Sequence, residues 1–204
     1  MSAPITESIP IPYEVETLST ERLALVPMTL DEVTEAHSPL ARSRTVTKYL
    51  RWEVRDHDDE ADSRSVRKRL ALSHITRQGD GFVWRVEFAT PDGEQGAEIG
   101  DVSVFAKSLR NKQFEIGWVF HPAIHGRGLA TEAAQKVLEI VFTKLGAHRV
   151  YAELDTRNEA SGRLCSVLGM RQEAVLKERE LVADEWHDVA IYAITESEWA
   201  ARAA

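Results

Sequence analysis

Short stretches in which apolar and polar residues alternate recur along the chain from residue 22 onward, and each predicts a β-strand. Alternation with period two buries every second side chain, as expected of a strand with one face on a core. These stretches are Arg22–Val26, 82–88, 98–105, 113–120, 148–154, about 172–181 and 186–195. Turn-forming residues between the middle stretches favour antiparallel hairpins.

Helical periodicity appears between these strands. One apolar stripe recurs every three or four residues and ends at Gly146; its members are Ala130, Ala133, Ala134, Val137, Val141 and Leu145. A second helix is predicted from Asn158 to Leu168. Earlier in the chain a helix is predicted to begin at Thr29, with Glu32 completing a capping box. A charged surface helix is predicted over about 59–76, because acids precede bases in the order that complements a helix dipole.

The order of these elements predicts one α/β domain over residues 17–204. A chain of 204 residues suits a single domain with a substantial core. No internal repeat, linker or low-complexity tract divides it. Residues 1–16 carry no periodic pattern, and we expect them to form a flexible N-terminal arm.

Composition excludes several classes of protein. The net charge of −8 argues against sequence-independent nucleic-acid binding, which relies on many Lys and Arg contacts. The single cysteine, Cys165, excludes an intramolecular disulfide and a multi-cysteine metal site, and no metal-ligand spacing is present. Neither a signal peptide nor an apolar run long enough to span a membrane is visible. We therefore expect a cytoplasmic protein without a metal or membrane partner.

The most informative stretch, residues 121–133, is a glycine-rich loop that leads directly into the predicted helix whose apolar stripe begins at Ala130. Gly126 and Gly128 let the backbone approach a ligand closely. The unpaired amides of the helix's first turn would point at that ligand, and the helix dipole favours negative charge there. The stretch predicts a cradle for a phosphate or pyrophosphate, although a tight loop that binds nothing would have the same glycines.

Two well-known phosphate loops fit poorly. A nucleoside-triphosphate loop places a lysine directly after its last glycine, and none follows here. A dinucleotide fingerprint needs a third glycine, where this chain has Thr131, and an acidic residue about 20 positions later, where it has Ala147–Arg149.

The loop instead resembles the acetyl-coenzyme-A loop of the GCN5-related N-acetyltransferases (GNAT), whose pattern Gln/Arg-x-x-Gly-x-Gly/Ala falls on His125–Ala130 with histidine in its first position. Further pieces extend the resemblance to about residues 18–196 and bring it closest to the ribosomal-protein-alanine acetyltransferase (RimJ/RimL-like) branch. They are Thr20–Leu25, Glu115–Trp118, Gly126–Ala133, Asn158–Ser161, Leu168–Met170 and the tail His187–Tyr192.

The resemblance implies the GNAT fold, a mixed central sheet flanked by helices with two strands that splay at the cofactor site. It implies acetyl-CoA as co-substrate and a primary amine, such as a protein N-terminus or a small molecule, as acceptor. Main-chain groups of Val119 and Phe120 would hold the pantetheine arm. Asn158 would contact the cofactor, although it serves equally well as a helix N-cap. The pyrophosphate would lie on Gly126, Arg127, Gly128, Leu129, Ala130 and Thr131.

The resemblance departs from the broad family at the general acid, because Cys165 occupies the position where many family members have a tyrosine in that role. A buried cysteine is usually a small core residue. In the closest branch a serine takes the acid role, and it corresponds to Ser161. The branch places the base at Glu180, with Glu178 on the same strand face under period two.

Other residues and other functions stay open. Glu115 is a rival base and a candidate for binding a cationic substrate. His187 and Asp188 are adjacent on a strand and should point to opposite faces, so a structural role is favoured. The missing tyrosine leaves open a non-catalytic acyl-CoA-binding or regulatory domain, and an enzyme that uses another acyl-CoA is a further alternative. A homodimer is possible.

Overall fold

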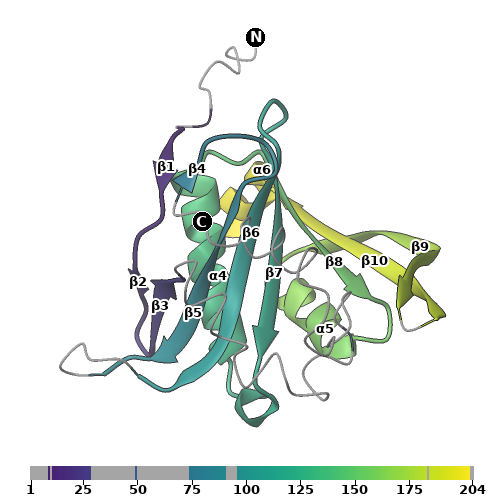
Figure 1. The fold of residues 1–204 in the computed structure, drawn as a ribbon, viewed down its shortest axis with the longest axis horizontal. Coiled ribbons are helices and arrows are strands. Elements are labelled where there is room, and N and C mark those ends of the chain that lie inside the picture. Colours follow the sequence, from purple (N-terminus) through teal and green to yellow (C-terminus); the bar gives the residue numbers. More distant parts are fainter. Residues whose placement is uncertain are drawn as a thin grey trace.

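A computed structural model of the chain describes residues 9, 11–28, 49, 74–90, 96–182 and 184–202. Its main feature is a twisted eight-stranded sheet with the order β2-β3-β5-β6-β7-β8-β10-β9 (Figure 1). The strands are β2 (Leu18–Ser19), β3 (Leu23–Pro27), β5 (Gly81–Phe88), β6 (Glu98–Ser108), β7 (Gln113–Phe120), β8 (Arg149–Asp155), β9 (Arg171–Val182) and β10 (Glu185–Thr195). All neighbours run antiparallel except β7 and β8, which are parallel.

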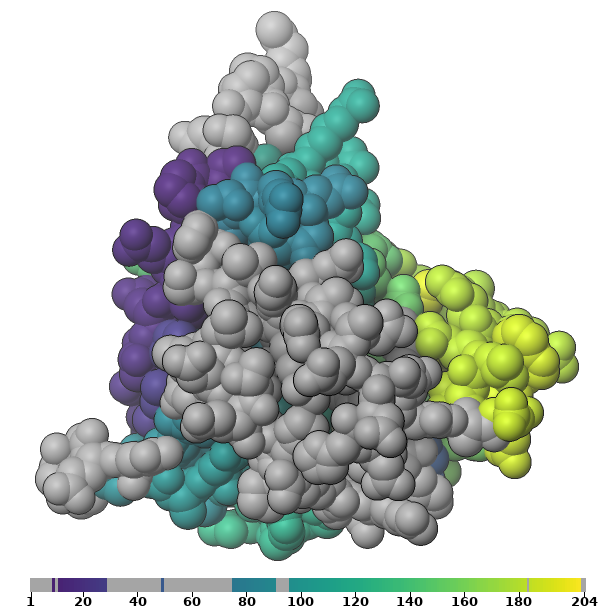
Figure 2. Space-filling view, in the orientation of Figure 1, coloured from purple at the N-terminus to yellow at the C-terminus, as the bar shows by residue number. Residues whose placement is uncertain are grey.

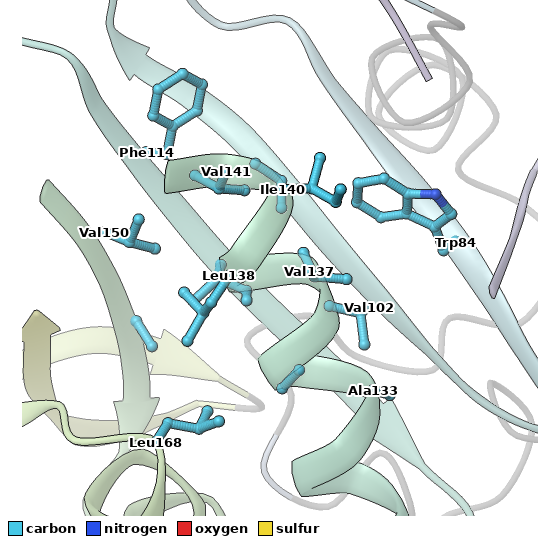
Figure 3. Close-up of a cluster of buried hydrophobic side chains, with 14 of the residues drawn as sticks. Trp84, Val102, Phe114, Ala133, Val137, Leu138, Ile140, Val141, Val150 and Leu168 are labelled. Atoms are coloured by element: carbon cyan, nitrogen blue, oxygen red, sulfur yellow. The ribbon is translucent and has the colours of Figure 1, made fainter. Parts of the chain in front are cut away.

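The core lies between this sheet and α4 (Leu129–Thr143). Alternate strand residues, such as Trp84, Val102 and Phe114, are fully buried and meet the apolar stripe of α4 (Figure 3). Burying one such large apolar side chain contributes about 1.5–3 kcal/mol. The sheet face against α4 is therefore the apolar one, and residues between the buried ones belong to the opposite face.

In the described part of the chain, three further helical segments flank these elements. They are the 3₁₀ turn η1 (Pro122–Ile124), α5 (Glu159–Val167) and α6 (Glu196–Arg202). Trp199 of α6 stacks on Phe142 of α4, with ring centroids 5.4 Å apart. Within the described residues, no helix is long and apolar enough to cross a membrane.

The parallel pair β7 and β8 diverges soon after it begins. Cα partners are present at only three positions, where Gln113–Glu115 lie opposite Arg149–Tyr151. Both strands then continue, β7 to Phe120 and β8 to Asp155, and Figure 1 shows them spreading apart. The main chains of the two strands therefore part, and we refer to this V-shaped divergence, between β7 on one side and the end of β8 with the start of α5 on the other, as the cleft.

The hairpin of β9 and β10 projects from the side of the molecule (yellow-green in Figure 2). The pair Leu181 and Trp186 near its tip is 56% and 61% exposed. The hairpin register slips between His187 and Val189, and Glu178 takes a positive φ of 48°. The regular alternation on which the expectation for Glu178 and Glu180 rested is therefore interrupted between them.

The structure confirms the main predicted strands and both helices after residue 128. Asn158 is the N-cap of α5 rather than its first residue. The predicted helix over 59–76 is wrong at its end, where His74–Ile75 form β4 and pair with β1 (Tyr13–Glu14). The rest of that helix, and the helix predicted from Thr29, lie outside the described residues. Within the predicted N-terminal arm, Ile9 is buried in the core and residues 13–14 form β1.

Candidate active site

The glycine loop joins β7 to α4 and needs two left-handed backbone conformations. Gly126 and Gly128 have φ values of 74° and 75°. A residue with a Cβ would cost roughly 1–2 kcal/mol in this region. His121 stabilises the start of the loop, because its Nδ1 accepts the amide hydrogen of Ala123 at 3.1 Å. Glycine is therefore required by the shape of the loop.

The first turn of α4 presents amide groups beside this loop. The amides of Leu129, Ala130 and Thr131 have no intrahelical acceptors, since they precede the first closed helical hydrogen bond. The Leu129 side chain is buried in the core, which holds the turn in place. A Cβ added to Gly126 would meet no atom within 4 Å, so there is space beside the loop. These amides and the helix dipole suit an anionic group such as a pyrophosphate.

Glu132 anchors this turn to the first part of the chain. Its carboxylate accepts hydrogen bonds from Thr20 Oγ1 at 2.5 Å, from the Arg22 amide at 3.0 Å and from Arg22 Nε at 2.6 Å. Arg22 Nη1 also donates to the carbonyl of Arg127 at 3.2 Å. Burial raises the pKa of Glu132, but these hydrogen bonds outweigh it and leave the pKa below its ordinary value. No pattern in the sequence predicts this contact, since 110 residues separate Arg22 from Glu132.

Arg127, one of the loop residues expected to hold the pyrophosphate, has a specific side-chain contact. Its guanidinium carbon lies 5.5 Å from the centre of the Phe88 ring, a cation–π contact. The side chain is thus directed toward β5, while its main chain stays in the loop.

The wall formed by β7 offers main-chain groups to the cleft. His121 donates to the carbonyl of Ile99, and Val119 lies opposite Asp101 in the same register. Since main-chain groups alternate in direction along a strand, those of Val119 point toward β6 and those of Trp118 and Phe120 point toward β8. The predicted role of Phe120 is compatible with this register, whereas the main-chain groups of Val119 face β6 rather than β8.

The other wall carries Asn158 and Ser161. The Asn158 side chain accepts the Ser161 amide hydrogen at 3.1 Å and so caps α5. Trp118 Nε1 reaches across and donates to Ser161 Oγ at 3.2 Å. Because the serine oxygen is the acceptor in this contact, its own proton stays available for donation into the cleft. No pattern in the sequence predicts the contact between Trp118 and Ser161.

Cys165 is a core residue, one helical turn after Ser161. Its side chain is fully buried, and burial raises the pKa of its thiol to about 12. The thiol is therefore neutral at physiological pH and is a poor substitute for the tyrosine acid. This agrees with the structural interpretation of Cys165.

At the end of β8, Asp155 forms a network that the sequence did not reveal. Arg157 Nη2 lies 2.7 Å and His187 Nδ1 lies 3.1 Å from Asp155 Oδ2. Burial raises the pKa of Asp155, but the Arg157 hydrogen bonds and both charges outweigh it and lower the pKa. Asp188 binds Lys177 instead, at 2.7 Å. The adjacent His187 and Asp188 thus have separate partners, as the strand geometry predicted.

The predicted carboxylates have different surroundings. Glu115 Oε2 lies 2.8 Å from Lys107 Nζ, in the part of β7 that still pairs with β8. Glu180 lies on β9 opposite His187 and is half-buried. Within the described part of the chain, no three metal-ligating side chains gather into a cluster.

Comparison with known proteins agrees with this architecture. The acetyltransferase (GNAT) domain family matches residues 22–171. The uncharacterized N-acetyltransferase YoaA of Bacillus subtilis is 29% identical over 177 residues, which cover 87% of this chain and 95% of that protein. The uncharacterized N-acetyltransferase YnaD of the same organism is 41% identical over 101 residues, covering 50% of this chain and 59% of its own length.

More distant matches carry more specific names. The [ribosomal protein uS5]-alanine N-acetyltransferase of Escherichia coli is 26% identical over 151 residues, covering 72% of this chain and 75% of that protein. Spermidine N-acetyltransferase from Vibrio cholerae, solved with CoA and spermine, superposes with a TM-score of 0.69 at 20% identity, covering 89% of this chain and 99% of that one. RimL, a ribosomal L7/L12 α-N-protein acetyltransferase solved with coenzyme A, superposes with a TM-score of 0.72 at 19% identity, covering 88% and 98%.

The chain therefore belongs to the GNAT acetyltransferase family. Its sheet of eight strands flanked by helices is the GNAT acyl-CoA N-acyltransferase fold. It is accordingly an acyl-CoA-dependent N-acyltransferase.

Proposed function

We propose that this protein transfers the acetyl group of acetyl-CoA to a primary amine, either a protein N-terminal α-amine or a small-molecule amine, by direct attack in a ternary complex. The observation that carries the proposal is the cleft itself. A glycine loop with open amides lies at the end of β7, and the β7 and β8 walls part beside it. Ser161 stands on the second wall, bonded across to Trp118.

Each part of the cleft has a task in this proposal. The amides of residues 126–131 hold the pyrophosphate, and the main chain of Trp118 and Phe120 binds the pantetheine arm. Asn158 supports that wall by capping α5, and in this proposal its side-chain amide also contacts the cofactor. Ser161 donates a proton to the thiolate as the thioester is cleaved. The family resemblance adds Glu180 as a candidate base and Glu115 as a group that attracts a cationic amine.

The kind of amine decides how strong a base is needed. An α-amino group has a pKa near 8 and a lysine side chain one near 10.4, so at neutral pH the lysine costs about 3 kcal/mol more to deprotonate. One carboxylate, acting through a water molecule, is sufficient for an α-amine. This chemistry supports a protein N-terminus as the acceptor, whereas the spermidine enzyme among the similar structures supports a polyamine.

Two measurements test the proposal. First, acetyl-CoA should raise the melting temperature of the protein, since binding to the folded state alone stabilises it. Second, free thiol should be released when an alanine-initiated peptide, spermine or an Nα-blocked lysine is added, and mass spectrometry should find the acetylated amine. Succinyl-CoA serves as the comparison for acyl-group preference.

The alternative is a non-catalytic acyl-CoA-binding domain. It is favoured by the buried, neutral thiol of Cys165 at the position of the usual tyrosine. Binding of acetyl-CoA without thiol release from any amine of the panel would establish this alternative. Absence of acetyl-CoA binding would contradict both.

A further inference from the structure

A half-buried carboxylate, Asp101, lies on β6 beside the cleft. It is opposite Val119 of β7 and Arg85 of β5 in the sheet register. Its neighbours Gly100 and Val102 are buried on the side of α4. Because side chains alternate along a strand, Asp101 projects from the face opposite α4.

Ser103 and Gly117 lie next to Asp101 on that face. Ser103 is two residues farther along β6 and is opposite Gly117. A Cβ on Gly117 would come within 2.9 Å of Ser103 Oγ, so the serine hydroxyl occupies the space beside the bare glycine. Gly117 is two residues past Glu115, the last β7 residue paired with β8. Asp101 and Ser103 thus border the cleft where its walls begin to part.

Among the described residues Asp101 has no cationic partner, unlike other carboxylates near the cleft. Within the part of the chain that the structure describes, no hydrogen bond or ion pair engages its side chain. Nε of its cross-strand neighbour Arg85 instead donates a hydrogen bond to Glu87 Oε1 at 2.5 Å. Glu115 is paired with Lys107, and Asp155 is paired with Arg157.

The charges around Asp101 favour its protonated form near neutral pH. Burial and repulsion from Glu98 on the same strand raise the pKa of Asp101 to about 7. The charged groups on the flanking strands are Arg85 with Glu87 on β5, and Glu115 with Lys107 across β7 and β6. A general base works best when its pKa lies near the working pH, because it is then both ionised and able to hold a proton.

We infer that Asp101 is the general base that takes the proton from the attacking amine. The inference rests on the proposed function. Neighbouring strands are about 4.8 Å apart, so the carboxylate on β6 reaches an amine at the cleft edge of β7 through one water molecule.

The step balances as follows. The ammonium gives one proton through water to the Asp101 carboxylate, and Asp101 later releases it to solvent. The freed nitrogen lone pair forms the C–N bond to the acetyl carbon as the C–S bond breaks. The departing sulfur carries the electron pair of the C–S bond and takes the hydroxyl proton of Ser161. The second proton lost by the nitrogen then returns to the Ser161 oxygen.

The pH profile of kcat, at saturating acetyl-CoA and with the best amine of the panel, tests this inference. In the wild type a limb that rises with pH through about 7 is expected. Asp101→Asn should lower kcat about 100-fold at pH 7 and move the rise in kcat to the higher pH at which the amine itself loses its proton. Raising the pH should restore part of the rate, because the amine then deprotonates without help. Acetyl-CoA binding, measured by calorimetry, should be unchanged.

Two variants complete the experiment. Glu98→Gln is the matched control on the same strand, and it should keep the plateau rate but move the limb to lower pH. Glu180→Gln tests the base implied by the family. The inference is overturned if kcat of Asp101→Asn still rises through about pH 7, or if that rise disappears only in Glu180→Gln.

Failure of the inference can be told apart from failure of the proposed function. If the wild type binds acetyl-CoA but acetylates no amine of the panel, the proposed function is contradicted and the base role falls with it. If the wild type acetylates an amine and Asp101→Asn keeps its rate and pH profile, only the role of Asp101 is contradicted.

Discussion

The two sides of the cleft are built in different ways. The proposed cofactor side is contiguous in sequence, since the loop and the first turn of α4 span residues 126–131 and owe their shape to two left-handed glycines. The proposed amine side is assembled from alternate residues of separate strands, with Asp101 and Ser103 on β6 and Gly117 on β7. Binding of a common cofactor can thus be encoded locally, whereas recognition of the amine depends on strand register.

The strongest test of this comparison is Ser161→Ala, because Ser161 stands where the two sides meet. Loss of a general acid typically costs 10²–10⁴ in rate, and we expect kcat to fall about 100-fold. Affinity for acetyl-CoA should not change. Cys165→Ala, four residues later on the same helix, is the matched control and should keep kcat. Equal effects of both variants would point to damage of α5 rather than to loss of an acid.

Asp101→Asn should stabilise the protein at alkaline pH. The pKa of Asp101 is raised to about 7 in the folded state, against about 3.9 when unfolded. The wild type therefore loses stability as pH rises from about 4 to 7, and the amide variant does not. We expect equal melting temperatures near pH 4 and a variant several degrees higher at pH 8. A constant difference at all pH values would contradict the raised pKa and leave only a packing effect.

Gly128→Ala tests the cofactor side alone. An alanine at φ 75° costs roughly 1–2 kcal/mol and disturbs the loop, which should weaken acetyl-CoA binding about tenfold in calorimetry. Gly146→Ala carries a similar strain at φ 62°, at the far end of α4. It should lower the melting temperature yet leave the dissociation constant alone. Equal loss of affinity in both would mean that general stability, not loop shape, governs binding.

The smallest effect is expected for Glu132→Gln. The substitution removes the negative charge of the carboxylate that Thr20 and Arg22 bind beside the loop. The partly exposed ion pair between Arg22 and Glu132 contributes about 1 kcal/mol. Acetyl-CoA should bind a few-fold more weakly. Glu139→Gln, which breaks an exposed pair with Lys136 later in the same helix, should change nothing. If the Glu132 variant also binds normally, the anchor to the first strands contributes only to folding.

Much of the fold was predictable from the sequence, and so were the glycine loop and the Asn158 cap of the candidate site. Periodicity found the long strands and α4, since each buries one repeating face. It missed β1 and β4, which are too short to show a period, and α6. The bulge at Glu178 was also hidden, because an extra residue in one strand depends on how its partner pairs.

By itself, the sequence determined the glycine loop, the helix that follows and the cap at Asn158, because local backbone preference and hydrogen bonding decide them. The tertiary structure alone decided which distant residues meet. It joined Arg22 to Glu132 and Trp118 to Ser161, and it placed Asp101 beside Val119 without a cationic partner among the described residues. The reason is physical: pairings between strands and the pKa values they set depend on register and burial, which no local pattern records.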